Sequence, residues 1–428
     1  MTPGARLAAA IEVLDTLARE RAAADDILKA WGRGHRFAGS GDRRAIAEHV
    51  YAALRARARS SWRMGADDGR ALVLGAIGID PADAAFTGEG HAPPAVTADE
   101  RERLTAPLAE EPEWVRASVP EWIAEKLNAR FGHTWLTEAQ ALAGVRAPVD
   151  LRVNALRGEL DAALRLLAAD GVEPVRTPWS AHGLRLPPAY ATDIQTSRAW
   201  KTGWVEVQDE ASQIAVALAD PQPGATVVDY CAGGGGKTLA LAAGMRGEGR
   251  LVATDVNVKR LDALAPRLER AGARADVRRI GPEGEGAYDL AAAADLVFVD
   301  APCTGSGTWR RHPEASWRLT PETITRLAKL QRDIIGHAAR LVRPGGRLLY
   351  ATCSVFEDEN EATAAAFLAQ TSGFQPLPIA DAAKAAQGLT QEGRDRLAEL
   401  AAGSHTVQLT PNRTGTDGFF VALFERTA

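Results

Sequence analysis

The strongest constraint on the fold is a regular alternation of short apolar runs and longer amphipathic stretches, which begins near Val207. Strands alternating with helices are typical of a parallel sheet covered on both faces, so this part of the chain predicts an α/β fold. The last two apolar runs flank a turn around Pro411 and predict a hairpin that closes one edge of the sheet. The expected strands are residues 226–230, 251–254, 276–280, 296–299, 346–351, 405–409 and 418–425, and the expected helices are residues 237–243, 259–271, 321–341 and 358–369.

Chain length sets the expected domain organisation. The chain has 428 residues, and a single hydrophobic core stops growing at roughly 250–300 residues. We therefore expect an N-terminal helical domain at residues 1–147, a small α/β module at residues 148–206 and the alternating domain at residues 207–428. Within the first of these, residues 31–41 are rich in glycine and basic side chains and predict a loop, and residues 80–110 predict a loose connection between helices.

Composition and charge limit the cellular compartments and the binding partners that can be expected for this chain. No run approaches the roughly 18 apolar residues of a membrane span, and charges occur throughout the first 30 residues, which is unlike a signal peptide. We therefore expect a cytoplasmic protein with no membrane partner. A formal net charge of -5 argues against a uniformly basic nucleic-acid-binding surface. A cluster of arginines between Arg43 and Arg59 fits either local RNA contact or an ordinary solvated helix face.

A glycine-rich turn between an expected strand and helix indicates a nucleotide-type pocket. Four consecutive glycines precede Lys237, and glycine allows positive φ and close approach of a ligand to backbone N–H groups at a helix start. A phosphate loop of the ATP-binding type would need glycine where Cys231 stands, so that motif is absent. Asp255 ends the next expected strand, where a carboxylate either binds ribose hydroxyls or caps a helix. The pattern fits a nucleoside-bearing cofactor, whether nicotinamide, flavin or S-adenosylmethionine.

The three cysteines of the chain each follow an expected strand. Because the carboxyl ends of parallel strands share one edge of the sheet, Cys231, Cys303 and Cys353 could face one crevice. The alternative is that they are small buried hydrophobic residues. Three cysteines cannot form a disulfide framework, which favours a reducing compartment. They stand 72 and 50 positions apart without a CxxC pair or a nearby pair of histidines, so we expect no metal site.

Asp300 stands beside one of these thiols, and basic residues follow it. Residues 304–347 contain nine Lys and Arg against three acidic residues. Nearby positive charge lowers the pKa of a thiol and makes it a better nucleophile. A locally basic crevice in an acidic chain also suits an anionic polymer.

Four ordered motifs in the last 200 residues resemble the Sun/Fmu family of S-adenosylmethionine-dependent RNA cytosine-5 methyltransferases. The family loop CAAPGGKT corresponds to residues 231–238, with two glycines replacing Ala-Pro. The block resembling DAPCSGTG is residues 300–307, and Arg-His-Pro follows at 311–313. The ATCS block is residues 351–354, and the closing DGFF is residues 417–420. Residues 148–206 also resemble the RNA-recognition-like module of these enzymes, and the first helices are similar to a NusB-like RNA-binding domain.

The resemblance implies a fold, a reaction and a role for each motif. The fold would be a Rossmann-like methyltransferase domain with a mostly parallel seven-stranded sheet. Cys353 would add to carbon 6 of cytosine, Asp300 would bind the edge of the base, and Cys303 would help to remove the proton from carbon 5. The residues implied to hold S-adenosylmethionine are Cys231, Ala232, Gly233, Gly234, Gly235, Gly236, Lys237, Asp255 and Asp300.

One family position departs from the pattern, and the substrate stays open between alternatives. The aspartate that the family places near adenine would fall at about Gly281, so Glu283 or backbone groups would have to replace it. The expected substrate is small-subunit ribosomal RNA rather than DNA, with transfer RNA as the alternative. Two alternatives belong to other functional classes: an inactive RNA-binding assembly factor and a nucleotide-dependent oxidoreductase. The sequence gives no expectation about protein partners or oligomeric state.

Overall fold

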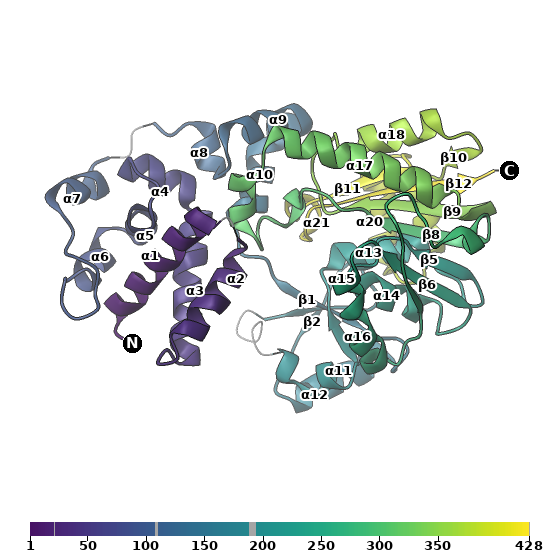
Figure 1. The fold of residues 1–428 in the computed structure, drawn as a ribbon, viewed down its shortest axis with the longest axis horizontal. Helices are drawn as coiled ribbons and strands as arrows, with labels where there is room; N and C mark the ends of the chain where they lie inside the picture. The colour runs from purple at the N-terminus through teal and green to yellow at the C-terminus, as the bar shows by residue number, and fades with distance from the viewer. Residues whose placement is uncertain (21, 108–109, 188–193, 428) are drawn as a thin grey trace. The chain divides into compact units, whose positions relative to one another are not determined.

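The computed structural model describes residues 1–20, 22–107, 110–187 and 194–427, which form two compact units (Figure 1). The first unit contains Met1–Arg146 and Thr308–Thr320, and the second contains Ala147–Gly307 and Pro321–Ala428. Within the described ranges, every helix is too short or too polar to pass through a bilayer.

Amphipathic helices build the first unit. The long helix α1 buries Leu7, Leu14 and Leu17 on one face, and α3 packs against it through Ile46 and Val50. Buried residues three, four or seven positions apart lie on one side of a helix, which is why this spacing predicted helices here. The elements are α1 (Pro3–Glu20), α2 (Ala24–Gly34), α3 (Ser40–Arg55), α4 (Arg57–Met64), α5 (Gly69–Ile77), α6 (Ile79–Ala85), α7 (Ala98–Thr105), α8 (Glu113–Ala117), α9 (Glu121–Phe131) and α10 (Trp135–Ala143).

Two expectations for this unit were wrong in detail. The predicted loop at residues 31–41 begins only after Gly34, because Trp31 lies one helical turn after Ile27 and both are buried on the same face of α2. The predicted loose connection at residues 80–110 contains most of α6 and all of α7. Helix α7 is mostly polar, but Thr97 and Glu100 form a capping box at its start, which stabilises a helix without an apolar stripe.

A short segment from the middle of the chain belongs to this helical unit. Residues Thr308–Thr320 contain the 3₁₀ helix η6 (Pro313–Arg318), which packs against α3. The buried Glu314 carboxylate accepts a hydrogen bond from Ala24 N at 3.0 Å, and the Arg57 guanidinium lies 4.9 Å from the centre of the Trp317 ring. The segment lies inside residues 207–428 in the sequence, so part of the basic stretch at residues 304–347 belongs to the helical unit.

The small α/β module forms the start of the second unit. Its antiparallel sheet has the order β2-β3-β1-β4 and packs around Leu151, Val153 and Leu167. Asn154 joins the module to the remainder of the unit, because its Nδ2 donates to Gly203 O at 2.9 Å and to Ala271 O at 2.8 Å. The elements are β1 (Val149–Val153), α11 (Leu160–Ala169), β2 (Val175–Arg176), β3 (Gly183–Leu186), α12 (Arg198–Lys201) and β4 (Val205–Val207).

A large mixed sheet with the order β10-β12-β9-β8-β5-β6-β7 forms the centre of the second unit. Strands β7, β6, β5, β8 and β9 run parallel, which confirms the expected α/β fold. Both faces are buried: Leu349 and Ala351 of β9 join one hydrophobic core, and Leu348 and Tyr350 join the other. The parallel strands are β5 (Thr226–Asp229), β6 (Arg250–Asp255), β7 (Asp276–Arg279), β8 (Ala294–Asp300) and β9 (Val342–Thr352).

Helices cover both faces of this sheet. Figure 1 shows α17 and α18 side by side on one of them. The predicted helix at residues 259–271 is divided at Ala263, because Pro266 has no N–H to donate to the carbonyl of residue 262. The helices are α13 (Glu210–Ala219), α14 (Gly236–Gly244), α15 (Val258–Asp262), α16 (Leu264–Ala271), α17 (Pro321–Ala339), α18 (Glu361–Gln370), α19 (Ile379–Ala385), α20 (Gln391–Ala401) and α21 (Pro411–Thr414).

The C-terminal strands pair differently from the expected edge hairpin. Strand β11 (Thr406–Leu409) pairs with β12 (Phe419–Arg426) as expected, but β12 lies inside the sheet against β9. The outer side of β12 is shared by β11 and by β10 (Phe374–Pro376), which raises the strand count in the described residues to eight. The three-residue β10 lacks the apolar run that would reveal a strand in the sequence.

Candidate active site

A cavity of about 830 Å³ opens at the carboxyl ends of β5, β6, β8 and β9. This is the edge at which open parallel sheets bind their ligands. All but one of the residues predicted from the sequence lie in its wall, and Gly235 is the exception. Those in the wall are Cys231, Ala232, Gly233, Gly234, Gly236, Lys237, Asp255, Asp300, Cys303 and Cys353.

The glycine loop connects β5 to the first turn of α14. Gly233 and Gly235 have φ angles of 53° and 83°, in the left-handed region that glycine adopts without strain. Gly235 serves packing rather than the cavity, since a Cβ there would collide with Leu264 of α16. Gly236 begins α14, so the N–H groups of a helix start belong to the cavity wall.

Asp255 holds the glycine loop in place from the end of β6. Its Oδ2 accepts a hydrogen bond from Gly233 N at 2.9 Å and its Oδ1 accepts one from Asn257 N at 2.7 Å. The cap of the following helix α15 is Asn257, whose side chain accepts from Arg260 N. The helix-cap interpretation of Asp255 was therefore wrong, and the carboxylate lies in the cavity wall.

Asp229 is a cavity residue that sequence reasoning missed. It ends β5, is fully buried, and its Oδ2 accepts from Thr238 Oγ1 at 2.6 Å. Its Oδ1 has no hydrogen-bond partner in the part of the chain that the structure describes. Burial, reinforced by the negative charge of Asp300, raises the pKa of Asp229 to about 7. The available signal was an acidic residue at the end of an apolar strand, four positions before the first glycine.

Two further residues outside the motifs hold the glycine loop. Gln208 Nε2 donates to Gly236 O at 3.2 Å, and Gln208 Oε1 accepts from Arg152 Nε at 2.7 Å. Arg267 of α16 donates to Gly234 O and forms an ion pair with Glu206 at 3.1 Å. Four successive glycines make this loop intrinsically flexible, and these contacts from Gln208 and α16 restrict it. Nothing in the local sequence marks either residue.

The structure brings Cys303 and Cys353 together, with their Sγ atoms 3.3 Å apart. The contact with Cys353, together with burial, raises the pKa of Cys303 well above that of an ordinary thiol. Burial and the nearby Asp255 likewise raise the pKa of Cys231 well above the ordinary value. All three thiols face the same cavity, and these shifts favour the neutral form of Cys303 and Cys231.

Asp300 forms an ion pair inside the cavity. Its Oδ2 lies 2.6 Å from Lys237 Nζ, and the ammonium group is 5.2 Å from the centre of the Phe419 ring. Burial opposes the charge on Lys237, but Asp300 outweighs it and raises the pKa of the lysine. The lysine of the glycine loop is thus positioned by a carboxylate that points into the cavity.

Glu359, which sequence reasoning also missed, connects the two loops that carry the thiols. Its carboxylate is fully buried. Oε1 accepts from Thr304 N and from Gln331 Nε2, both at 2.9 Å, and Oε2 accepts from Thr304 Oγ1 and Ser354 Oγ, both at 2.5 Å. Thr304 follows Cys303 and Ser354 follows Cys353, so one carboxylate fixes the neighbours of both thiols. An acidic residue close to a helix start has no sequence feature that would distinguish it from a solvated one.

Asn360 forms hydrogen bonds with the residues on both sides of Cys353. Its Oδ1 accepts from Thr352 Oγ1 at 2.6 Å, and its Nδ2 donates to Ser354 O at 3.0 Å. Like Glu359 it is fully buried. The pair therefore sets the position of Cys353 against the loop that carries Cys303.

The position at which the family has an aspartate near adenine, about Gly281 in this chain, lies in the cavity wall. Gly281 and Pro282 line the cavity, but Glu283 does not. The carboxylate nearest to Gly281 is that of Glu285, which accepts from Glu283 N at 2.9 Å and occupies the space that a Cβ on Gly281 would need.

Comparisons with known proteins agree with this geometry. Residues 215–425 match the family described as 16S rRNA methyltransferase RsmB/F, and residues 119–193 match the RsmF/B-like ferredoxin-like domain. The chain is 33% identical over 330 residues to the ribosomal RNA small subunit methyltransferase B of Pseudomonas putida, which covers 77% of this chain and 71% of that protein. The corresponding Pseudomonas syringae protein is 33% identical over 316 residues, 73% of this chain and 67% of that one.

Solved structures show the same fold. The crystal structure of PH0851 superposes with a TM-score of 0.75 at 26% identity and covers 100% of this chain and 99% of the other. A methyltransferase homolog protein from Pyrococcus horikoshii gives a TM-score of 0.59 at 26% identity, with 73% of this chain and 97% of the other covered.

Proposed function

This chain belongs to the RsmB/F family of 16S ribosomal RNA methyltransferases, and from that premise we propose that it methylates carbon 5 of a cytosine in small-subunit ribosomal RNA through a covalent bond to Cys353. The family makes the chain an S-adenosylmethionine-dependent RNA methyltransferase, so the nicotinamide and flavin alternatives fall away. The observation that carries the covalent mechanism is the pair of thiols 3.3 Å apart beside the Asp300–Lys237 ion pair.

The residues of the cavity fit S-adenosylmethionine. The cavity volume of about 830 Å³ suits a molecule of this size, since ligand pockets span roughly 300–1,000 Å³. Asp255 would hold the ribose and the glycine loop the charged methionine part, while Ile280, Leu330 and Ile334 supply apolar surface. The unpaired Asp229 Oδ1 is a buried acceptor that an ammonium or hydroxyl group could satisfy. S-adenosylmethionine, when bound, supplies an electrophilic methyl group.

Cys353 supplies the nucleophile that makes carbon 5 reactive. Its thiolate donates an electron pair to carbon 6 of the cytosine and forms a C–S bond, which moves electron density to carbon 5. Asp300, held by Lys237, would accept a hydrogen bond from the exocyclic amine and, once the ring nitrogen takes up a proton from water, from that ring N–H as charge shifts across the base. This step needs the cytosine outside a base-paired stack.

Cys303 would complete the reaction by removing the carbon 5 proton. Formation of the C–S bond removes the thiol–thiol hydrogen bond and the charge of Cys353, the first and third causes of the raised pKa of Cys303, while burial, the second, remains. Cys303 can then lose its proton to water and act as a base. When it takes the proton from methylated carbon 5, the electrons of that C–H bond restore the ring double bond, and Cys353 leaves as a thiolate.

The helical unit and the small module are proposed to bind the RNA around the target base. We retain residues 1–147 as an RNA-binding domain, residues 148–206 as an RNA-recognition-like module and residues 207–428 as the catalytic domain. The basic residues between Arg43 and Arg59 support this assignment of the helical domain.

Bisulfite sequencing tests the proposal directly. Small-subunit ribosomal RNA from cells lacking the protein is incubated with the purified chain and S-adenosylmethionine, and each cytosine is compared before and after. One cytosine should become resistant to conversion with the wild-type chain and none with Cys353→Ala. Transfer RNA incubated in parallel identifies the alternative substrate, and methylation by Cys353→Ala would refute the covalent mechanism.

A further inference from the structure

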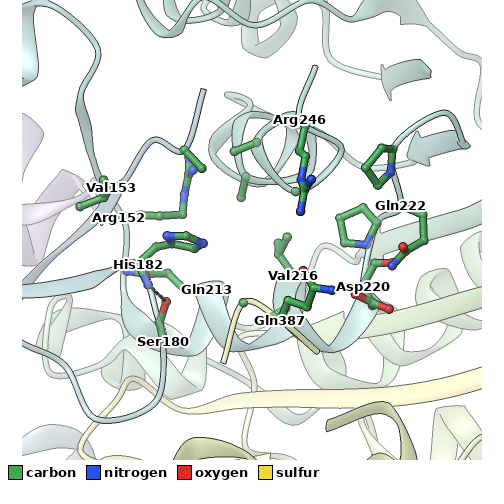
Figure 2. A pocket seen from close by; sticks show the side chains of 18 residues that line it. Arg152, Val153, Ser180, His182, Gln213, Val216, Asp220, Gln222, Arg246 and Gln387 are labelled. Atoms are coloured by element: carbon green, nitrogen blue, oxygen red, sulfur yellow. Dashed lines mark hydrogen bonds between the residues drawn. The ribbon is translucent and has the colours of Figure 1, made fainter. Parts of the chain in front are cut away.

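A second cavity, of about 590 Å³, lies between the small module and the catalytic helices (Figure 2). Its wall is formed by β1 and the β2–β3 loop on one side and by α13, residues 220–223 and the end of α14 on the other. Among the described residues the two cavities share no wall residue. They are connected by hydrogen bonds, because Arg152 and Gln213 in this wall both donate to Gln208 in the wall of the active site.

The wall contains a buried hydrogen-bond acceptor without a partner. Gln213 is 3% exposed, and its Nε2 donates to Gln208 O at 2.9 Å and to Leu151 O at 3.3 Å. These bonds fix the amide, so its oxygen cannot exchange places with its nitrogen. Oε1 has no hydrogen bond to any residue that the structure describes. Leaving a buried acceptor unpaired is unfavourable, and a ligand N–H or O–H in the cavity would satisfy it.

Arg246 supplies a cation at the same cavity. The structure records no hydrogen bond or ion pair for its side chain within the described ranges, and Figure 2 shows the guanidinium extending toward the open space near His182 and Gln387. Its φ of 55° lies in the left-handed region, which glycine would occupy without strain.

The remaining wall suits a flat, partly polar group. Val153, Val216 and Pro221 are apolar, and the imidazole of His182 offers a ring against which a base can stack. Burial, followed by the charge of Arg152, lowers the pKa of His182, which keeps this ring neutral. Asp220 at the other end faces Arg347 at 3.9 Å.

We propose that this cavity binds one unpaired nucleotide of the RNA substrate, with a base N–H on Gln213 Oε1 and a phosphate on Arg246. The substrate class rests on the proposed function. The volume of about 590 Å³ falls within the range for a ligand of nucleotide size. The bond from Arg152 to Gln208 would place this nucleotide next to residues that hold the glycine loop.

Fluorescence anisotropy with a labelled single-stranded RNA hexanucleotide tests the role of Arg246 in the full chain. Arg246→Ala should weaken binding by about tenfold or more, because it removes a charge-assisted hydrogen bond. It should also reduce the slope of log affinity against log salt by about 0.7, the value for one phosphate of a single strand. Arg274→Ala is the matched control, since Arg274 is exposed, lies in the same unit and is outside both cavities. It should leave both quantities unchanged.

A second variant distinguishes the contribution of the cavity space to RNA binding from the contribution of the Arg246 charge. Ala243→Leu fills the cavity from the end of α14 without changing any charged group, and it should also weaken RNA binding while circular dichroism stays that of the wild type. Calorimetric titration with cytidine monophosphate distinguishes a free nucleotide from one that binds only as part of RNA. If cytidine monophosphate gives a binding heat that disappears in Arg246→Ala, the cavity binds a free nucleotide. If RNA binds but cytidine monophosphate gives no heat, the cavity binds the nucleotide only as part of an RNA chain.

Wild-type RNA affinity and salt dependence in both Arg246→Ala and Ala243→Leu would overturn the inference. That result leaves the proposed function intact if Cys353 is still required for methylation. Conversely, a wild-type chain that binds the hexanucleotide through Arg246 but methylates no cytosine would refute the proposed function alone.

Discussion

Replacement of Glu359 with alanine tests how the two thiols are held together. The buried carboxylate accepts two hydrogen bonds on each oxygen. Hydrogen bonds to a charged group contribute about 1.5–3 kcal/mol each, so four set an upper bound of roughly 6–12 kcal/mol. The cost of burying the carboxylate offsets much of this sum, and we expect the free energy of unfolding to fall by about 2–4 kcal/mol.

The effect on catalysis should be larger than the effect on cofactor binding. Without Glu359, Thr304 and Ser354 lose their common partner, and the thiols beside them are no longer fixed 3.3 Å apart. A displacement of about 1 Å can lower a rate by roughly 10²-fold, so we expect kcat for methyl transfer to fall about 100-fold. The affinity for S-adenosylmethionine should stay unchanged, because Glu359 is not part of the cavity wall. The assays are single-turnover transfer of radioactive methyl and calorimetric titration of the cofactor.

Two further variants make the interpretation specific. Glu359→Gln should recover most of the rate, since one amide oxygen can still accept from Thr304 N and the amide nitrogen can donate to the hydroxyl groups. Glu357→Ala removes an exposed carboxylate two positions earlier and should behave as the wild type. A wild-type kcat in Glu359→Ala would refute the positioning role, and so would a loss of cofactor affinity equal to the loss of rate.

The other predictions concern individual residues of the cavity. Cys303→Ala should accumulate an RNA–protein adduct that survives denaturing electrophoresis, and its absence would remove Cys303 from proton abstraction. Asp255→Ala should weaken S-adenosylmethionine by about 1–3 kcal/mol through lost ribose bonds and a looser glycine loop, and unchanged affinity by calorimetry would place the ribose elsewhere. The pKa of Asp229 is about 7 in the folded chain, which is higher than in the unfolded chain. Between about pH 4 and pH 7 the folded chain therefore binds more protons than the unfolded chain. As the pH rises through this range, the folded chain loses up to about 1.4 kcal/mol of stability per pH unit. Asp229→Asn should remove this pH dependence, which is measured by urea unfolding at pH 5, 6 and 7. If the free energy of unfolding changes with pH in the variant as it does in the wild type, Asp229 does not titrate in this range.

The sequence predicted those parts of the site that depend on local order. Cys303 and Cys353 each stand directly after an apolar strand, and the rule that parallel strands end at one edge was sufficient to bring them together. Asp255 and the glycines followed from the same rule. The fold class was predictable for a related reason, since alternating strands and helices admit few arrangements.

The parts that sequence reasoning missed depend on contacts between distant segments. Gln208, Arg267 and Glu359 act through hydrogen bonds to residues 28, 33 and 55 positions away, and a polar side chain carries no local mark of such a partner. Asp229 differs, because its place before the glycines was visible but its burial was not. Burial decides whether a carboxylate is an ordinary anion or a group with a raised pKa, and only the packed sheet reveals it.

The segment Thr308–Thr320 connects the helical unit to the loop that carries Cys303. Gly307 is fixed beside the thiols, since its N–H donates to Cys353 O at 2.9 Å and its carbonyl accepts from Gly418 N at 2.8 Å. From the next residue onward the chain belongs to the helical unit, where the buried Glu314 accepts from Ala24 N. Removal of residues 1–147 would therefore deprive a segment that begins five positions after Cys303 of its packing partners. A single peptide bond joins the two environments, so we expect removal of the helical unit to loosen the Cys303 loop, and activity lost on truncation would then reflect this loop as well as any loss of the proposed RNA binding.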